Sequence, residues 1–91
     1  MTVRLIFTRQ YEKRAARFLK RHPALEKQYL KTLQLLELNP HHPALHLHPL
    51  SGKLRGLHSV SINLSSRITL ELLIREDEII AVNVGDHETV Y

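Results

Sequence analysis

The hydrophobic pattern changes its period between residues 38 and 57, and that change constrains the fold more than any other feature. Between residues 9 and 38 the apolar side chains recur at the three- and four-residue spacing of an amphipathic helix, whereas between residues 57 and 84 they alternate. Helices repeat about every 3.6 residues and strands about every 2, so the two stretches cannot share one secondary structure. The sequence therefore predicts helix followed by sheet.

Capping and breaking residues divide the helical stretch in two. Thr8 suits the N-cap of the first helix, and the pair His22-Pro23 interrupts it because the residue before a proline is pushed out of the α region. Asn39-Pro40 ends the second helix. The apolar stripes of this helical hairpin are formed by Tyr11, Ala15, Phe18, Leu19, Leu25, Tyr29, Leu33 and Leu36.

The remaining segments are predicted to be strands joined by short turns. The expected strands cover residues 2–7, a short stretch around Leu45–His48, and residues 57–63, 67–74 and 79–84. Turns as short as Leu64–Ser66 and Arg75–Glu78 imply an antiparallel meander. We expect a single α+β domain over residues 1–91, in the order β-α-α-β-β-β-β. Its helical hairpin packs on one face of a small, mainly antiparallel, twisted sheet.

Strand alternation predicts which side chains share a face. The face toward the helices is expected to hold the even-numbered residues Val60, Ile62, Ile68, Leu70, Leu72, Ile80, Val82 and Val84. The opposite, polar face is expected to hold Ser59, Ser61, Asn63, Arg67, Thr69, Glu71 and Asn83, with His87 if the last strand continues and with His46 and His48 from the short strand.

Charge and composition narrow the partners. Thirteen Lys and Arg against nine Asp and Glu give a net charge of +4, with seven histidines counted as neutral. A small basic domain favours nucleic acid or an acidic protein as partner. The absence of cysteine excludes disulfides, thiolate zinc sites, iron–sulfur clusters and a thiol nucleophile. No stretch suits a signal peptide or a membrane span, so we expect a cytoplasmic protein without membrane contact.

Histidines carry the most distinctive chemistry. His41, His42, His46 and His48 fall within eight residues. One interpretation is metal binding, since imidazole suits zinc, copper or nickel, although no carboxylate or thiolate lies nearby to complete a site. The other is acid–base catalysis, in which two histidines exchange protons with an RNA 2′-hydroxyl and a 5′-oxygen while a cation stabilises the phosphate. His48, His87 and Arg67 fit these roles.

Two further features suit a nucleic-acid substrate. In the loop Gly52–Gly56, Lys53 and Arg55 supply positive charge between glycines that let backbone approach a phosphate, although a hydrated hairpin loop has the same composition. Tyr91, four residues after His87, suits base stacking, or else belongs to a frayed terminus.

The segment from His48 onward resembles the RelE/ParE toxin superfamily of bacterial type II toxin–antitoxin pairs. The matching stretches are His48-Pro49-Leu50, GKLRGLHSVSIN (52–63), Arg67-Ile68, and Val84-Gly85-Asp86-His87 with Tyr91. The ending is most similar to the YafQ branch and the Lys-Leu-Arg-Gly loop to RelE. This chain has Ser61 and Ser65 where YafQ-type members carry a histidine and an aspartate, and Asp86 and His87 where RelE has basic residues.

The resemblance implies a ribosome-dependent endoribonuclease that cuts mRNA in the A site, needs no metal or cofactor, and forms a complex with an acidic antitoxin. It implies that His48 and His87 are the catalytic histidines, either being base or acid, and that Arg67 contacts the scissile phosphate. Substrate contacts are expected from Lys53, Arg55, Tyr91, Ser61 and His46.

Two alternatives remain open at this stage. ParE members share the fold but inhibit DNA gyrase through protein contacts, a role that does not require groups titrating near neutrality. A degenerate member would bind only its antitoxin.

Overall fold

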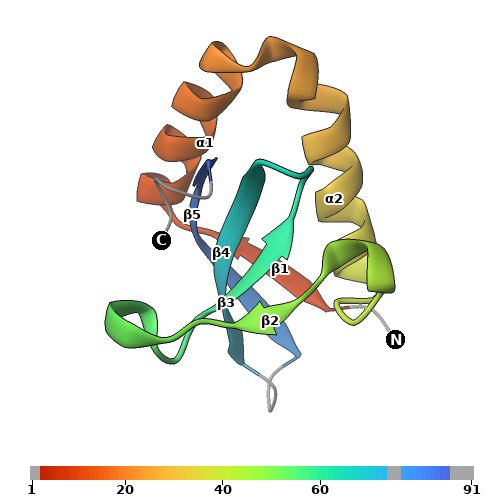
Figure 1. Cartoon of the computed structure of the whole chain (residues 1–91), viewed down its shortest axis with the longest axis vertical. Coiled ribbons are helices and arrows are strands. Elements are labelled where there is room, and N and C mark those ends of the chain that lie inside the picture. The colour runs from red at the N-terminus through yellow and green to blue at the C-terminus, as the bar shows by residue number, and fades with distance from the viewer. Residues whose placement is uncertain (1–2, 74–76, 87–91) are drawn as a thin grey trace.

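The computed structural model describes residues 3–73 and 77–86 and confirms the predicted order of elements (Figure 1). The five strands form one sheet in the order β1-β5-β4-β3-β2, with β1 parallel to β5 and the other neighbours antiparallel. The elements are β1 (Arg4–Phe7), α1 (Arg9–Arg21), α2 (Glu26–Leu38), β2 (His48–Pro49), β3 (His58–Ser61), β4 (Ser66–Leu73) and β5 (Glu78–Asp86), with 3-10 turns η1 (Pro23–Leu25), η2 (Pro43–Leu45) and η3 (Gly52–Leu54).

Helix α1 begins and ends at the residues that the sequence indicates. The Thr8 hydroxyl oxygen accepts a hydrogen bond from the Tyr11 backbone N–H at 3.1 Å, which satisfies one of the unpaired donors of the first turn. At the other end the His22 N–H donates to the Phe18 carbonyl at 2.9 Å, and Pro23 then starts the 3-10 turn η1. The local sequence is therefore sufficient to account for both ends of this helix.

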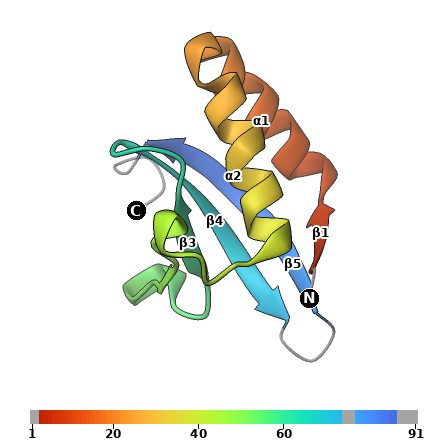
Figure 2. The same ribbon diagram turned by 90° about the vertical axis from the view of Figure 1, so that its right-hand side faces the viewer.

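The two helices cover one face of the sheet (Figure 2). Tyr11 from α1 and Tyr29 from α2 are buried between them, with their hydroxyl oxygens 2.8 Å apart. Thr32 is also buried in α2, and its hydroxyl donates to the Gln28 carbonyl at 2.8 Å. Neither helix in the described part of the chain is long and apolar enough to span a membrane.

The prediction of a strand around Leu45–His48 is wrong for most of that stretch. Residues Pro43–Leu45 form the turn η2, which begins where the Ala44 N–H donates to His42 Nδ1 at 3.1 Å. His46 then takes a left-handed conformation with φ of 50°, so only His48 and Pro49 pair with β3. The turn buries Leu45 in the core at 1% exposure. Burial of this leucine therefore determines the local conformation, and the alternation of apolar and polar residues does not.

The expected alternation fails in the first half of β5. Ile79 and Ala81 are buried, whereas Ile80 and Val82 are only half-buried. The cause is a β-bulge: Thr69 is opposite Asn83 but Leu70 is opposite Ala81, which leaves Val82 as the extra residue. One inserted residue reverses which side chains face the helices, and Val84 lies beyond it in the predicted phase.

The polar face also departs from expectation in its exposure. Ser59 and Thr69 are opposite each other on β3 and β4 and are buried, at 0% and 2% exposure. Ser66, expected in a turn, is instead the buried first residue of β4. Of these, Ser59 and Thr69 place buried hydroxyl groups on the face opposite the helices.

The tyrosine pair gives a test of how the helices are joined. Tyr29→Phe leaves the buried Tyr11 hydroxyl without its partner, and should lower the free energy of unfolding by about 1–3 kcal/mol, whereas Tyr11→Phe with Tyr29→Phe should be nearly neutral. Urea titrations at neutral pH measure both. Equal stability of the single variant and the wild type would contradict this role.

The same pair predicts alkaline destabilisation. Burial raises the pKa of both Tyr11 and Tyr29 above the ordinary value near 10. Above about pH 10 the unfolded chain releases these protons and the folded chain retains them, so the folded state loses stability as pH rises. The double phenylalanine variant should lose less stability than the wild type between pH 9 and about pH 11.

Candidate functional site

Each outer strand of the sheet is shorter than the strand beside it. Strand β1 pairs with β5 only along Glu78–Ala81, and β2 pairs with β3 only at His58 and Ser59. Among the described residues, the remaining part of β5 and the remaining part of β3 therefore have no strand on their outer side. The open edge of β5 lies beside α1, and the open edge of β3 lies beside α2 (Figure 1). Each of these edges lines a hollow.

The hollow along β3, which we call the edge groove, brings together four of the residues expected at the active site. It has a volume of about 750 Å³ and is bordered by the first turns of α2, by η2 and by the β3–β4 turn. The expected residues that line it are His46, His48, Ser61 and Arg67.

His48 is oriented by the backbone of the segment before it. Its Nδ1 lies 2.8 Å from the carbonyl oxygen of His46. Because a carbonyl can only accept, Nδ1 carries the proton in this contact, and in the neutral ring Nε2 is then the basic nitrogen. The left-handed turn at His46 thus selects the tautomer in which Nε2 of His48 can accept a proton.

Arg67 lies on the same face of the sheet as His48. His48 is opposite Ser59, Ser61 is two residues further along β3, and Ser61 is opposite Arg67. The Arg67 guanidinium donates from Nη1 to the Ser61 hydroxyl oxygen. A planar guanidinium held in this way can present N–H donors to a phosphate.

The β3–β4 turn is held by a side chain to which sequence reasoning gave no such role. Asn63 Oδ1 accepts hydrogen bonds from the N–H groups of Ser65, at 2.9 Å, and Ser66, at 2.7 Å. This turn connects the end of β3, which carries Ser61, to the start of β4, which carries Arg67. The signal available in the sequence was an asparagine at the start of the expected turn, in the stretch Asn63-Leu64-Ser65-Ser66.

The basic loop lies apart from the edge groove. Lys53 lines a separate hollow of about 490 Å³ that it shares with His48, on the side of β2 toward η3. Arg55 is exposed and follows η3, between glycines with φ of 68° and 98°. Figure 1 shows this turn projecting beyond the end of β2. The structure thus connects Lys53 to His48 but brings neither basic residue to Arg67.

Two expected site residues, His87 and Tyr91, lie outside the described residues. Strand β5 ends at Asp86, which is opposite Ser66 at the start of β4. His87 follows it directly in the chain.

The histidine cluster does not gather around one point in the described structure. His42 accepts from the Ala44 N–H, and the His41 N–H donates to Asn39 Oδ1 at 3.0 Å. Within residues 3–73 and 77–86, no group of three or more histidine, cysteine or acidic side chains could hold a metal ion. Of the four histidines, only His46 and His48 line the edge groove.

Comparison with known proteins shows which fold this is. The sequence matches no protein-family model and no curated protein. The structure is similar to a mutant of the toxin YafQ from Escherichia coli, with a TM-score of 0.74, 21% identity and 98% of each chain covered. It is similar to a metal-bound toxin from Helicobacter pylori (TM-score 0.74, 20% identity, 100% of both chains covered). It is also similar to a chain of the E. coli DinJ–YafQ toxin–antitoxin complex (0.70, 22%, 100% of this chain and 99% of that chain). The chain has the fold of RelE/ParE-type toxins, as the sequence resemblance predicted.

The Asn63 contacts predict how the site is held. Asn63→Ala removes the acceptor of two backbone N–H groups and should lower the free energy of unfolding by about 1–2 kcal/mol, with faster amide exchange at Ser65 and Ser66. Asn63→Asp keeps an acceptor oxygen at the same position and serves as the control. Unchanged exchange in the alanine variant would show that these hydrogen bonds do not hold the turn.

Proposed function

We propose that this chain is the toxin of a bacterial type II toxin–antitoxin pair and a ribosome-dependent, metal-independent endoribonuclease. The observation that supports this most is that His46, His48, Ser61 and Arg67 line one groove, although they come from three separate segments of the chain. The fold shared with solved toxins supports the toxin role. The site of action would be mRNA in the A site, in the cytoplasm.

The proposed reaction is an in-line attack within RNA. A base removes the proton of the ribose 2′-hydroxyl, and the 2′-oxygen bonds to the adjacent phosphorus. The bond from phosphorus to the 5′-oxygen breaks, and an acid protonates that oxygen as it leaves. The products are a 2′,3′-cyclic phosphate and a 5′-hydroxyl, so no water or external reagent is consumed.

His48 and His87 share the two proton transfers in this proposal. The contact between Nδ1 of His48 and the His46 carbonyl leaves the basic nitrogen of the neutral ring at Nε2, which favours His48 as the base. His87 would then be the acid, although the reverse assignment uses the same two rings. An imidazole can either donate or accept a proton, so either ring can take either role.

Arg67 stabilises the phosphate in this proposal. Negative charge develops on the non-bridging oxygens as the bond to the 2′-oxygen forms, and guanidinium N–H groups can donate to them. Ser61 orients the guanidinium through its hydroxyl. His46 and Lys53 border the same region from opposite sides of His48, and Arg55 and Tyr91 would bind further parts of the strand.

An acidic antitoxin is the proposed protein partner. Solved relatives of this fold include the DinJ–YafQ complex and the YoeB–YefM complex from Staphylococcus aureus. In this chain, Arg9 and Lys13 are exposed on α1, and among the described residues no further strand of the sheet lies beside the outer edge of β1. Basic side chains and an open strand edge suit an acidic segment that pairs by its backbone.

The decisive test measures growth arrest and translation-dependent mRNA cleavage. His48→Ala and Arg67→Gln should each reduce the cleavage rate by about 100-fold or more, and His48→Ala with His87→Ala should abolish growth arrest. His41→Ala is the matched control, since His41 belongs to the same cluster but does not line the edge groove.

Other outcomes would identify another function. Cleavage by the double histidine variant at the wild-type rate would refute the catalytic assignment. Supercoiling inhibition without mRNA cleavage would indicate a gyrase inhibitor. Antitoxin binding without any toxicity of the wild type would indicate a degenerate member of the fold.

A further inference from the structure

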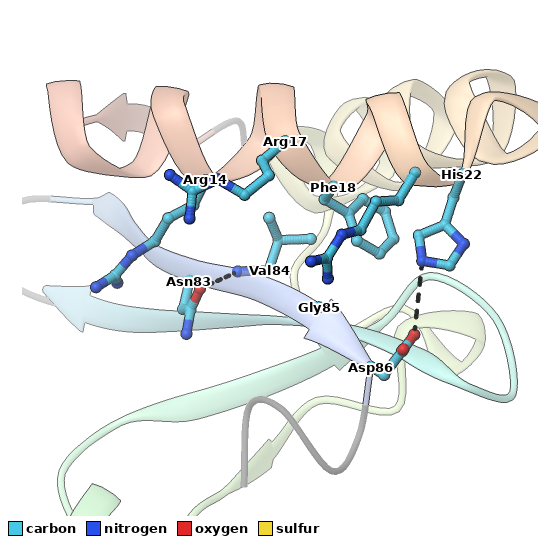
Figure 3. Close-up of a pocket in the computed structure, with 9 residues that line it drawn as sticks. Arg14, Arg17, Phe18, His22, Asn83, Val84, Gly85 and Asp86 are labelled. Carbon is cyan, nitrogen blue, oxygen red and sulfur yellow. Dashed lines mark hydrogen bonds and ion pairs between the residues drawn. The ribbon is translucent and has the colours of Figure 1, made fainter.

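A second hollow, of about 270 Å³, lies between α1 and the last residues of β5 (Figure 3). We call it the α1–β5 groove. It occupies the open edge of β5, beyond the point where β1 stops pairing at Ala81. Its lining includes Arg14, Arg17 and Arg21 on α1 and Asn83, Gly85 and Asp86 on β5.

The groove is strongly basic. Arg14, Arg17 and Arg21 recur at three- and four-residue spacing, so they form one stripe along α1. Three guanidinium groups therefore line the hollow, and within residues 3–73 and 77–86 the one carboxylate that lines it belongs to Asp86. One oxygen of that carboxylate lies 4.0 Å from His22 Nε2. A concave surface with this excess of positive charge attracts a polyanion.

The backbone at this edge is already occupied by side chains. The Val82 carbonyl oxygen accepts a hydrogen bond from Arg14 Nη1 at 3.0 Å, and the Val84 N–H donates to Asn83 Oδ1 at 2.9 Å. A peptide that added a strand here would have to displace both contacts. The edge of β5 is therefore suited to a ligand that binds through charge and not through backbone pairing.

One row of paired residues across the sheet relates the α1–β5 groove to the proposed active site. Ser61 lines the edge groove, Arg67 is opposite Ser61, and Gly85 of the α1–β5 groove is opposite Arg67. Neighbouring strands lie about 4.8 Å apart, so this row spans about 10 Å across the sheet. A single RNA strand covers this distance with about two nucleotides, so its neighbouring phosphates can reach Arg67 and the groove arginines in turn.

We propose that the α1–β5 groove binds phosphodiesters of the RNA substrate, next to the nucleotide whose phosphate contacts Arg67. This inference rests on the proposed function, because it places a further part of the same strand. Guanidinium groups match the oxygens of a phosphate in a planar, bidentate arrangement. An acidic peptide offers carboxylates to the same groups, but the occupied edge of β5 and the short distance across the sheet to Arg67 favour RNA.

The test is RNA binding without cleavage. A short 2′-O-methyl RNA, labelled with a fluorophore, cannot react because its 2′-oxygen has no proton to lose. Arg17→Gln with Arg21→Gln removes two exposed groove side chains and leaves Arg14 in contact with β5. Lys27→Gln with Lys31→Gln removes the same charge from exposed positions on α2 that do not line the groove, and is the control.

Fluorescence anisotropy over a range of salt concentrations should show about tenfold weaker binding for the arginine variant. Its log–log salt slope should fall by about 1.4, since each phosphate contact on a single strand contributes about 0.7. The lysine variant should bind almost as well as the wild type at the same salt concentration.

Three results would overturn the inference. Equal losses of RNA affinity in the arginine and lysine variants would show that affinity depends on net charge and not on the groove. If the arginine variant bound RNA as well as the wild type, and the wild type cleaved mRNA, the role of the groove in RNA binding would be refuted and the proposed function would stand. Loss of binding to a labelled acidic peptide with RNA binding retained would assign the groove to a protein. A wild type that neither binds RNA nor cleaves mRNA would refute the proposed function itself.

Discussion

Backbone hydrogen bonding is the constraint on which the rest of this structure depends. The strands at the two edges of the sheet are too short to pair with the full length of the strands beside them. Backbone groups left near the protein interior must still find partners, and here side chains supply several of them. Arg14 and Asn83 do so on β5, and Asn63 does so at the β3–β4 turn.

The unequal strand lengths also produce both grooves. Where the flanking strands end, the helices still extend over the sheet (Figure 2). One hollow is lined by α1 and the end of β5, and the other by the start of α2 and the end of β3. The edge groove collects imidazoles and Arg67, and the α1–β5 groove collects guanidinium groups. A row of three paired residues, Ser61, Arg67 and Gly85, joins them. The proposed chemistry and the proposed substrate path therefore have one structural origin.

The site combines rigid and locally strained elements. Arg67 and Ser61 lie on paired strands, which hold side chains more firmly than loops do. His48 instead depends on the left-handed backbone of His46, a conformation that a residue with a side chain seldom adopts. In that conformation the His46 carbonyl accepts a hydrogen bond from the His48 ring, and this bond selects one tautomer of the imidazole.

The sequence alone determined the features that depend on nearby residues. Thr8, Pro23 and the helical stripe ending near Leu36 were enough to predict the helical hairpin, because capping and periodicity act within a few residues. The order of elements, and the sharing of one face by Ser61 and Arg67, followed from alternation. Only the tertiary structure decided the bulge at Val82, the turn that buries Leu45 and the approach of Arg14, Arg17 and Arg21 to β5. Each of these depends on which distant strand or helix a residue meets, and a single inserted residue reverses the direction of every side chain that follows it in a strand.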